Sequence, residues 1–223
     1  MQTDYLFDAV LWDMDGTLVD SEPYWLASET ALMAEFGYNW TTDDQRHCLG
    51  GPLLRVGRYM HQLTGEVESP EFFMEELIRR TTAAFTSGLT PMAGVAERLE
   101  ELFHANIPMA LVTASPRVMA EKVVSSLKRE YFKSIVSSDD VNNSKPDPEG
   151  YLKAASELDV DIRKCLIFED SNTGVKAALA SGASVIGLTH LTTFEPHPRK
   201  VDIPSIQSVS NQSLNSLYVA LPS

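Results

Sequence analysis

Cysteines, long apolar runs and a basic N-terminal segment are scarce or missing in this chain. Among 223 residues there are two cysteines, Cys48 and Cys165, which lie far apart and fit no metal-binding spacing. We therefore expect two reduced thiols in a cytoplasmic protein rather than a disulfide framework. No apolar run approaches the roughly 18 residues that a membrane-spanning helix needs. The segment from Met1 to Asp4 carries no positive charge of the kind that opens a signal peptide.

Positive charge is also in short supply. The chain has 18 lysines and arginines against 31 acidic residues, a formal net charge of −13, and its first lysine is Lys122. Contacts with nucleic acid or with an anionic membrane need a basic face, so we expect neither partner. A site that binds phosphate must therefore gather its positive charge locally.

The apolar pattern divides the chain into a helical region and a mixed region. Helical spacing without a strand pattern predicts helices at residues 21–36, 41–49, 52–63 and 70–85. From Pro91, short apolar strands alternate with helices, which predicts a parallel sheet with helices on both faces. The strands are expected at residues 5–12, 107–113, 134–137, 165–168 and 184–188, and the helices at 94–104, 116–127, 148–158 and 172–181.

These patterns predict an α/β protein with an insertion. We expect residues 1–20 and 89–223 to form the α/β core domain and residues 21–88 to form an all-α domain inserted into it. Residues 189–200 are expected to be a polar loop, because Pro196 and Pro198 block regular structure. A short helix is expected at residues 214–219.

The segment DMDGTLVD, Asp13 to Asp20, directly follows the first predicted strand. Asp13 and Asp15 thus lie at the carboxyl end of a strand, where open α/β sheets place their active sites, and Gly16 permits a tight turn. One carboxylate can attack phosphorus to form an aspartyl-phosphate, and the second can protonate the leaving oxygen and then activate water. A Mg²⁺ ion held by oxygen ligands would offset the repulsion between anions. The plainer alternative is a solvated Asp-Gly turn.

A hydroxyl group follows the strand predicted at residues 107–113. The Thr113 hydroxyl and the backbone N–H groups after it, beginning at Ala114, can bind phosphate oxygens beside a helix N-terminus. The alternative is an ordinary helix cap formed by Ser115 before Pro116, and the residues alone favour this cap.

Two further segments carry charge. In SKPDP, Lys145 precedes a proline, which favours an extended backbone, and its ammonium group can reach both a phosphate and the attacking carboxylate. The alternative is a solvated surface lysine. Glu169 and Asp170 end the strand predicted at residues 165–168, where they can ligate Mg²⁺ or hold its ligands, although Asp170 or Ser171 can instead cap the next helix.

Together these four segments resemble the motifs of the haloacid dehalogenase-like superfamily, in the group with a helical cap inserted after the first motif. The resemblance runs from about Phe7 to Leu188. It implies a Rossmann-like core, a Mg²⁺ cofactor and catalysis by Asp13, Asp15, Thr113 and Lys145. The resemblance further implies phosphate binding by Asp13, Gly16, Thr113, Ala114 and Lys145, and metal binding by Asp13, Asp15, Glu169 and Asp170. Whether Glu169 ligates the metal or holds a bound water is left open.

The resemblance also narrows the reaction. Asp15 argues against a dehalogenase, because only a phosphoryl leaving group needs that acid. The absence of lysine from residues 21–88 argues against a phosphonatase and against a mutase of the β-phosphoglucomutase type, and Trp25 stands where such mutases have a cap histidine. We therefore expect a Mg²⁺-dependent phosphatase of small phosphate monoesters, such as sugar or sugar-alcohol phosphates. The alternatives are such a mutase and a non-catalytic protein that binds a phosphate ligand.

Candidates for contacts with the leaving group lie in the inserted domain. Trp25, Gly51, Arg55 and Arg58 are the candidates, although Trp25 also fits the core of the insert and arginines are commonly solvated. The expected partner is a small phosphorylated metabolite, and the expected assembly is a monomer or a homodimer.

Overall fold

The computed structural model describes residues 5–48, 53–85, 89–209 and 211–219. The chain divides into two compact units, of which one comprises residues 1–20 with 90–223 and the other residues 21–89. Each unit has its own hydrophobic core. We call them the core unit and the cap unit.

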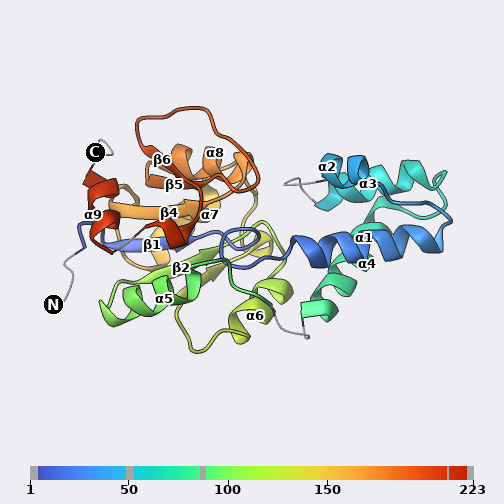
Figure 1. Cartoon of the computed structure of the whole chain (residues 1–223). Helices are drawn as coiled ribbons and strands as arrows, with labels where there is room; N and C mark the ends of the chain where they lie inside the picture. The colour runs from blue at the N-terminus through green and yellow to red at the C-terminus, as the bar shows by residue number, and fades with distance from the viewer. Residues whose placement is uncertain (1–4, 49–52, 86–88, 210, 220–223) are drawn as a thin grey trace. The chain divides into compact units, whose positions relative to one another are not determined.

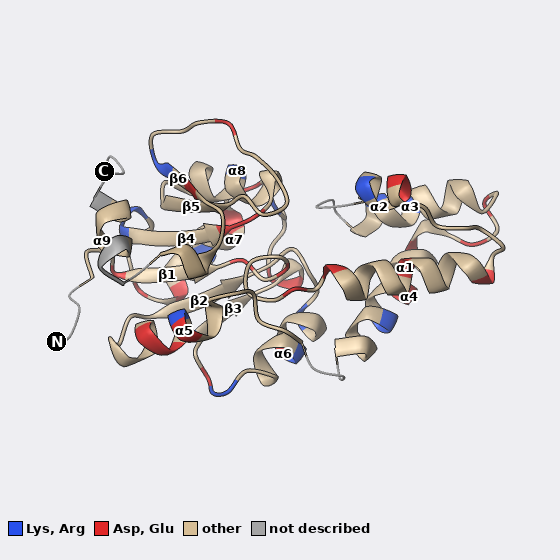
Figure 2. Ribbon diagram, viewed as in Figure 1, with Lys and Arg blue, Asp and Glu red and all other residues tan. Residues whose placement is uncertain are grey.

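The core unit is built on a parallel sheet of six strands in the order β3-β2-β1-β4-β5-β6 (Figures 1 and 2). The strands are β1 (Ala9–Trp12), β2 (Met109–Val112), β3 (Ser134–Val136), β4 (Cys165–Glu169), β5 (Ser184–Leu188) and β6 (Lys200–Ile203). The helices of this unit are α5 (Val95–His104), α6 (Arg117–Ser125), α7 (Glu149–Glu157), α8 (Asn172–Ser181) and α9 (Asn211–Val219). Short 3₁₀ turns lie at Ser138–Asp140, Ile162–Lys164 and Ile206–Ser208.

Both faces of the sheet are covered. Ala9 and Leu11 of β1 belong to a buried cluster with alanines of α7 and α8, where small side chains let the helices lie close to the strands. Val10 and Trp12 point to the opposite face and are also fully buried. Trp12 stacks on Phe168 of β4, with ring centroids 4.6 Å apart. The predicted α/β architecture with a doubly covered parallel sheet is thus confirmed.

The register of the sheet brings three chain segments to one edge. Trp12, the last residue of β1, pairs with Leu111 of β2 and with Phe168 of β4. The residues that follow these three positions therefore leave the sheet at the same edge. They include Asp13 and Asp15 after β1, Thr113 after β2, and Glu169 and Asp170 at the end of β4.

The cap unit is all helical within the described residues. Its helices are α1 (Glu22–Glu35), α2 (Thr42–Cys48), α3 (Leu53–Leu63) and α4 (Pro70–Ala84). Their apolar faces meet in one cluster, which includes Leu32, Met60, Phe73 and Leu77, all fully buried. Ser21 lies at the cap position before α1, as its place before Glu22 and Pro23 predicts, but its side chain makes no capping hydrogen bond.

The first and last strands differ from the expectations, and helix α9 begins at Asn211 rather than at residue 214. The first strand begins at Ala9 rather than at Tyr5. The predicted polar loop ends at a strand, β6, that was not expected from the sequence. Two of the four residues in its sequence KVDI are charged, so the apolar pattern of a strand is missing there. Lys200 can sit in this strand because its ammonium pairs with Asp202 and lies 5.1 Å from the Phe194 ring centroid. The ion pair and the aromatic face offset the cost of burying the charge.

Charge is distributed along both units. Figure 2 shows lysine and arginine as separate short segments, and no described helix is lined by them along its length. Among the described residues, no helix is both long enough and apolar enough to cross a bilayer.

Candidate active site

Asp13 is placed by the central strand of the sheet. It directly follows β1, and its backbone N–H donates to the Phe168 carbonyl at 3.1 Å. The residue is only 7% exposed. Gly16 follows with a φ of +78°, and a Cβ there would lie 2.1 Å from Asp170 Oδ2. Only glycine combines that backbone conformation with that close approach, so the turn depends on it.

Lys145 lies at the centre of the site. Its ammonium donates to Asp13 Oδ1 at 2.5 Å, to Glu169 Oε1 at 2.7 Å and to the Val112 carbonyl at 3.0 Å. An ammonium has three N–H donors, so these acceptors use all of them. The side chain is 8% exposed, and the alternative of a solvated surface lysine is therefore wrong.

Glu169 is fully buried and accepts five hydrogen bonds. Oε1 accepts from Lys145 and, at 2.7 Å, from the Tyr151 hydroxyl. Oε2 accepts from the backbone N–H groups of Asp170 and Ser171 and from the Ser171 hydroxyl. A Cβ at Gly174 would lie 1.8 Å from Oε1, so the glycine makes room for this carboxylate.

Asp170 completes a buried acidic cluster. Asp13, Glu169 and Asp170 each offer a carboxylate oxygen within 4.8 Å of the others. Thr17, fully buried, donates to Asp170 Oδ1 at 3.1 Å. Ser171 caps α8 by accepting from the Gly174 N–H at 3.0 Å, as one of the alternatives predicted, which leaves Asp170 facing the cluster.

Asp15 is approached by two hydroxyls from the segment after β2. Ser115 Oγ donates to Asp15 Oδ2 at 2.7 Å, and Thr113 Oγ1 lies 3.5 Å from the same oxygen. Thr113 Oγ1 also accepts from the Ser115 N–H at 2.9 Å. Ser115 therefore does not cap α6: the residue at the cap position is Pro116, and no side chain caps the helix there. Ala114 is exposed between them.

The clustered charges shift the pKa values of the site. Burial, followed by the charge of Glu169, raises the pKa of Asp13 to about 7, although Lys145 acts in the opposite direction. Burial and the charge of Asp13 raise the pKa of Asp170 well above its usual value. Burial disfavours the charged form of Lys145, but Asp13 and Glu169 outweigh this and raise its pKa. Three carboxylates thus share one cation in a buried site.

This arrangement is matched by a known family. Residues 10–188 fit the model of the haloacid dehalogenase-like hydrolases. The chain belongs to that family. The resemblance inferred from the four motifs is thereby confirmed.

Relatives of this hydrolase include phosphatases. The "Phosphorylated carbohydrates phosphatase" of Thermotoga maritima is 33% identical over 185 residues, covering 82% of this chain and 86% of the relative. The "Hexitol phosphatase B" of Escherichia coli is 30% identical over 176 residues, covering 78% and 79%. A crystal structure of a family hydrolase from Deinococcus radiodurans, with bound phosphate and sodium, matches with a TM-score of 0.71 at 30% identity and covers 96% of this chain and 99% of its own.

The acidic cluster of the hydrolase suits a hard divalent cation. Its donors are carboxylate oxygens, the ligands that Mg²⁺ prefers. Lys145 alone does not neutralise three carboxylates, and burial, followed by the charges of the neighbouring carboxylates, raises the pKa values of Asp13 and Asp170. The residues therefore fit the cofactor predicted from the sequence.

The structure gives less support to the leaving-group contacts predicted in the cap unit than to the motifs of the core unit. Trp25 is partly buried and packs against the cap cluster, which fits its alternative reading as a core residue. Arg55 and Arg58 are exposed, and Arg55 donates to the Cys48 carbonyl at 3.3 Å. Gly51 lies outside the described residues. Leaving-group contacts by these residues stay a prediction.

Three residues near the site were not assigned their observed contacts from the sequence. Ser115 was weighed only as a helix cap, and Thr17 was part of the first motif without a role of its own. Tyr151 reads as an apolar position of a helix. The available signal was its hydroxyl, since a buried tyrosine usually finds a polar partner.

Proposed function

We propose that this protein is a Mg²⁺-dependent phosphatase that hydrolyses sugar or sugar-alcohol phosphates through an aspartyl-phosphate on Asp13. It is a phosphoric monoester hydrolase, in keeping with the named activities of its relatives. The observation that carries the mechanism is the contact of a buried carboxylate with a buried ammonium, Asp13 Oδ1 to Lys145 Nζ at 2.5 Å, at the end of the central strand.

Two features support this substrate class. The relatives act on phosphorylated carbohydrates and hexitol phosphates, as their names state. The cap unit contains no lysine, because the first lysine of the chain is Lys122. If residues of the cap unit contact the leaving group, as predicted from the sequence, a second phosphate would meet arginines but no lysine there, which favours neutral polyhydroxyl leaving groups over bisphosphates.

The first step is attack of Asp13 on phosphorus. One of its carboxylate oxygens forms the new O–P bond while the ester O–P bond breaks. Lys145 balances charge between the carboxylate and the phosphoryl oxygens. Asp15 donates its proton to the leaving alkoxide oxygen, so the alcohol departs neutral. Ser115, which donates to Asp15 Oδ2, fixes the direction of that carboxyl group.

The second step returns the enzyme to its starting state. Asp15, now ionised, takes a proton from water, and the water oxygen attacks phosphorus. The bond between phosphorus and the Asp13 oxygen breaks, releasing inorganic phosphate and the free carboxylate. The two steps use Asp15 as acid and then as base, which requires a single proton to be passed in and out.

A bound Mg²⁺ would supply the positive charge that lets an anionic carboxylate meet an anionic phosphate. The residues proposed to hold it are Asp13 and Asp170 through their carboxylates and Asp15 through its backbone carbonyl. Glu169 was included as a ligand or as the holder of a bound water. Because its oxygens already accept five protein hydrogen bonds, we favour the indirect role.

The test is a substrate panel with purified protein. Phosphate release is measured from hexose phosphates, hexitol phosphates, a sugar bisphosphate and p-nitrophenyl phosphate, with Mg²⁺ and with excess chelator. We expect the highest kcat/KM for sugar or hexitol monophosphates and no turnover in chelator. Absence of release from every ester in the presence of Mg²⁺ would instead favour the non-catalytic binding protein.

A further inference from the structure

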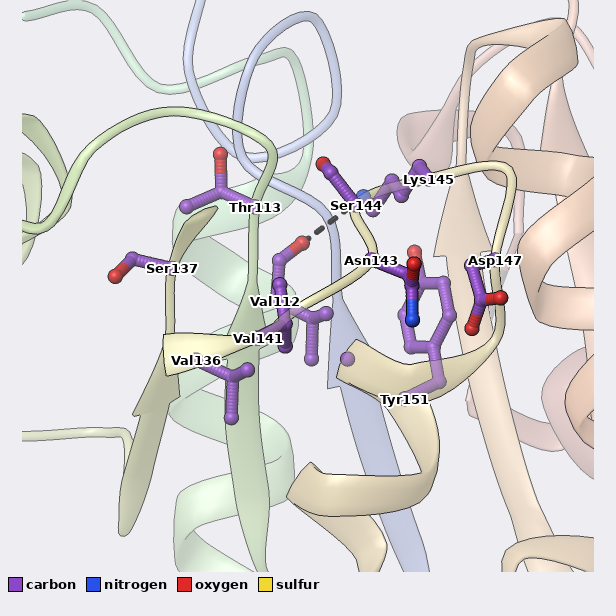
Figure 3. Close-up of a pocket in the computed structure, with 11 residues that line it drawn as sticks. Val112, Thr113, Val136, Ser137, Val141, Asn143, Ser144, Lys145, Asp147 and Tyr151 are labelled. Carbon is purple, nitrogen blue, oxygen red and sulfur yellow. Dashed lines mark hydrogen bonds between the residues drawn. The ribbon is translucent and has the colours of Figure 1, made fainter. Parts of the chain in front are cut away.

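Tyr151 of α7 contacts both charged partners at the centre of the site. It is fully buried, and its hydroxyl donates to Glu169 Oε1 at 2.7 Å. Its ring centroid lies 5.0 Å from the Lys145 ammonium. Figure 3 shows Lys145 and Tyr151 at the wall of one small pocket. A phenylalanine would fill the same space but would lack the hydroxyl.

The hydroxyl and the ammonium share a single acceptor. Glu169 Oε1 accepts from Lys145 and from Tyr151, both at 2.7 Å. The other oxygen of Glu169 is held by backbone N–H groups at the start of α8. The carboxylate is therefore fixed in place. Its Oε1 accepts from two donors that come from different segments of the chain, Lys145 and Tyr151.

The shared acceptor affects the contact between the Lys145 ammonium and Asp13. The ammonium lies between two carboxylates, with Asp13 Oδ1 at 2.5 Å and Glu169 Oε1 at 2.7 Å. Glu169 is fully buried, and the two donors to its Oε1 are Lys145 and Tyr151. Without the Tyr151 hydroxyl, the negative charge on Oε1 would be balanced by Lys145 alone. The ammonium would then be drawn toward Glu169 and away from Asp13.

We propose that Tyr151 is a positioning residue, which balances the charge of Glu169 so that Lys145 stays directed at Asp13 and at the transferring phosphoryl group. The role rests on the proposed phosphatase activity. Tyr151 touches neither the substrate nor the reacting atoms in this account. Its effect passes through Lys145, whose ring contact with Tyr151 adds a face that attracts the cation.

A purely structural role makes a different prediction. A buried tyrosine that only satisfies its hydroxyl would lose stability when the hydroxyl is removed, without a specific loss of rate. Tyr131 provides the matched control. It is 6% exposed and donates to Glu100 Oε1 at 2.6 Å, on a pair of residues that takes no part in the site.

The experiment compares Tyr151→Phe with Tyr131→Phe and with the wild type. We measure kcat and KM with the best substrate of the panel, inhibition by orthovanadate and by inorganic phosphate, and Tm. Orthovanadate mimics the geometry of the transition state of phosphoryl transfer. Its affinity therefore reports groups that stabilise the transition state more than the ground state.

For Tyr151→Phe we expect kcat to fall about tenfold, as for other partners that orient active-site ligands, with a much smaller change in KM. Orthovanadate inhibition should weaken by the same factor as kcat/KM, and phosphate inhibition should weaken less. Tyr131→Phe should keep both kcat and orthovanadate inhibition.

An unchanged kcat and orthovanadate inhibition in Tyr151→Phe, with only a lower Tm like that of Tyr131→Phe, would overturn the positioning role while leaving the phosphatase intact. Failure of the wild type to release phosphate from any ester would show instead that the proposed function is wrong, and the role of Tyr151 would fall with it.

Discussion

At the scale of single residues, the acid–base group of the proposed reaction depends on a serine from another strand end. Asp15 is only partly buried, so it needs a local partner to hold one orientation. Ser115 Oγ is the closer of its two hydroxyl contacts, at 2.7 Å against 3.5 Å for Thr113. A hydrogen bond at 3.5 Å is weak, so of these two contacts the one from Ser115 contributes more to the orientation of Asp15.

Ser115→Ala should therefore lower kcat about tenfold, which corresponds to the loss of roughly 1.4 kcal/mol from a single hydrogen bond. The effect is measured by steady-state phosphate release. Ser126→Ala is the control, because it removes a hydroxyl that donates at 2.7 Å to the Val123 carbonyl, a bond that takes no part in the site. Equal rates for the two variants would rule out this role for Ser115.

At the scale of elements, helix α1 carries a buried acid within the cap unit. Glu29 is 6% exposed, and burial, followed by the charge of Glu22, raises its pKa from 4.5 to about 7. The folded protein thus keeps a proton that the unfolded chain releases between these two pH values. Folding stability is therefore highest below the unfolded pKa and is lost as pH rises toward 7.

Glu29→Gln should remove this pH-dependent loss. At about 1.4 kcal/mol per pKa unit, the variant gains up to roughly 3 kcal/mol at pH 8 relative to the wild type, and much less at pH 5. Thermal unfolding of both proteins at the two pH values measures the difference.

Glu35, at the end of the same helix, is the control with the opposite sign. The hydrogen bond from Arg80 lowers the pKa of this exposed carboxyl, so its small contribution is present at neutral pH and is lost as pH falls. Glu35→Gln should give no gain at pH 8. A gain of equal size in both variants would contradict the assignment to Glu29.

The helices and strands also show which parts of the fold can be predicted from the sequence alone. Helix α8 was predicted at its observed bounds because it has local signals at both ends, with Ser171 capping its start and Gly182 at a φ of +99° after its end. Strand β6 lacked such signals, since two of its four residues are charged. Lys200 is held there by contacts with Asp202 and Phe194, which exist once the chain has folded.

The same distinction holds for the site. Motif positions placed Asp13, Asp15, Lys145, Glu169 and Asp170 at one sheet edge, because parallel strands end together. The partners of these groups were not predictable in the same way. Ser115 and Tyr151 contact them across 100 and 18 residues of sequence, respectively. Such contacts depend on side-chain directions that a one-dimensional pattern does not contain.

At the scale of the whole molecule, metal binding should be visible as stability. Asp13, Glu169 and Asp170 repel one another in a buried cluster, and ligands that bind only the folded state stabilise it. We expect Mg²⁺ to raise the Tm of the wild type in a concentration-dependent manner. In chelator, Asp170→Asn should have a Tm higher than the wild type by a few degrees, since about 1 kcal/mol corresponds to roughly 2–4 °C at this size.

The two conditions together distinguish a metal site from a packing effect. Asp170→Asn should show little further rise in Tm when Mg²⁺ is added, because it lacks a proposed ligand. Differential scanning fluorimetry over a Mg²⁺ titration gives both quantities. A wild-type Tm that does not respond to Mg²⁺, or a variant that responds as the wild type does, would contradict the proposed ligand set.

The most direct test of the account is phosphate release by Asp13→Asn, with Mg²⁺ and the best monophosphate of the panel. The amide cannot form the aspartyl-phosphate, so we expect kcat to fall by at least about a thousandfold, a loss of the size seen when an attacking side chain is removed. Asp8→Asn, at an exposed carboxylate paired with Lys164 before β1, should keep wild-type activity. Turnover by Asp13→Asn at the rate of Asp8→Asn would contradict the assignment of Asp13 as the nucleophile.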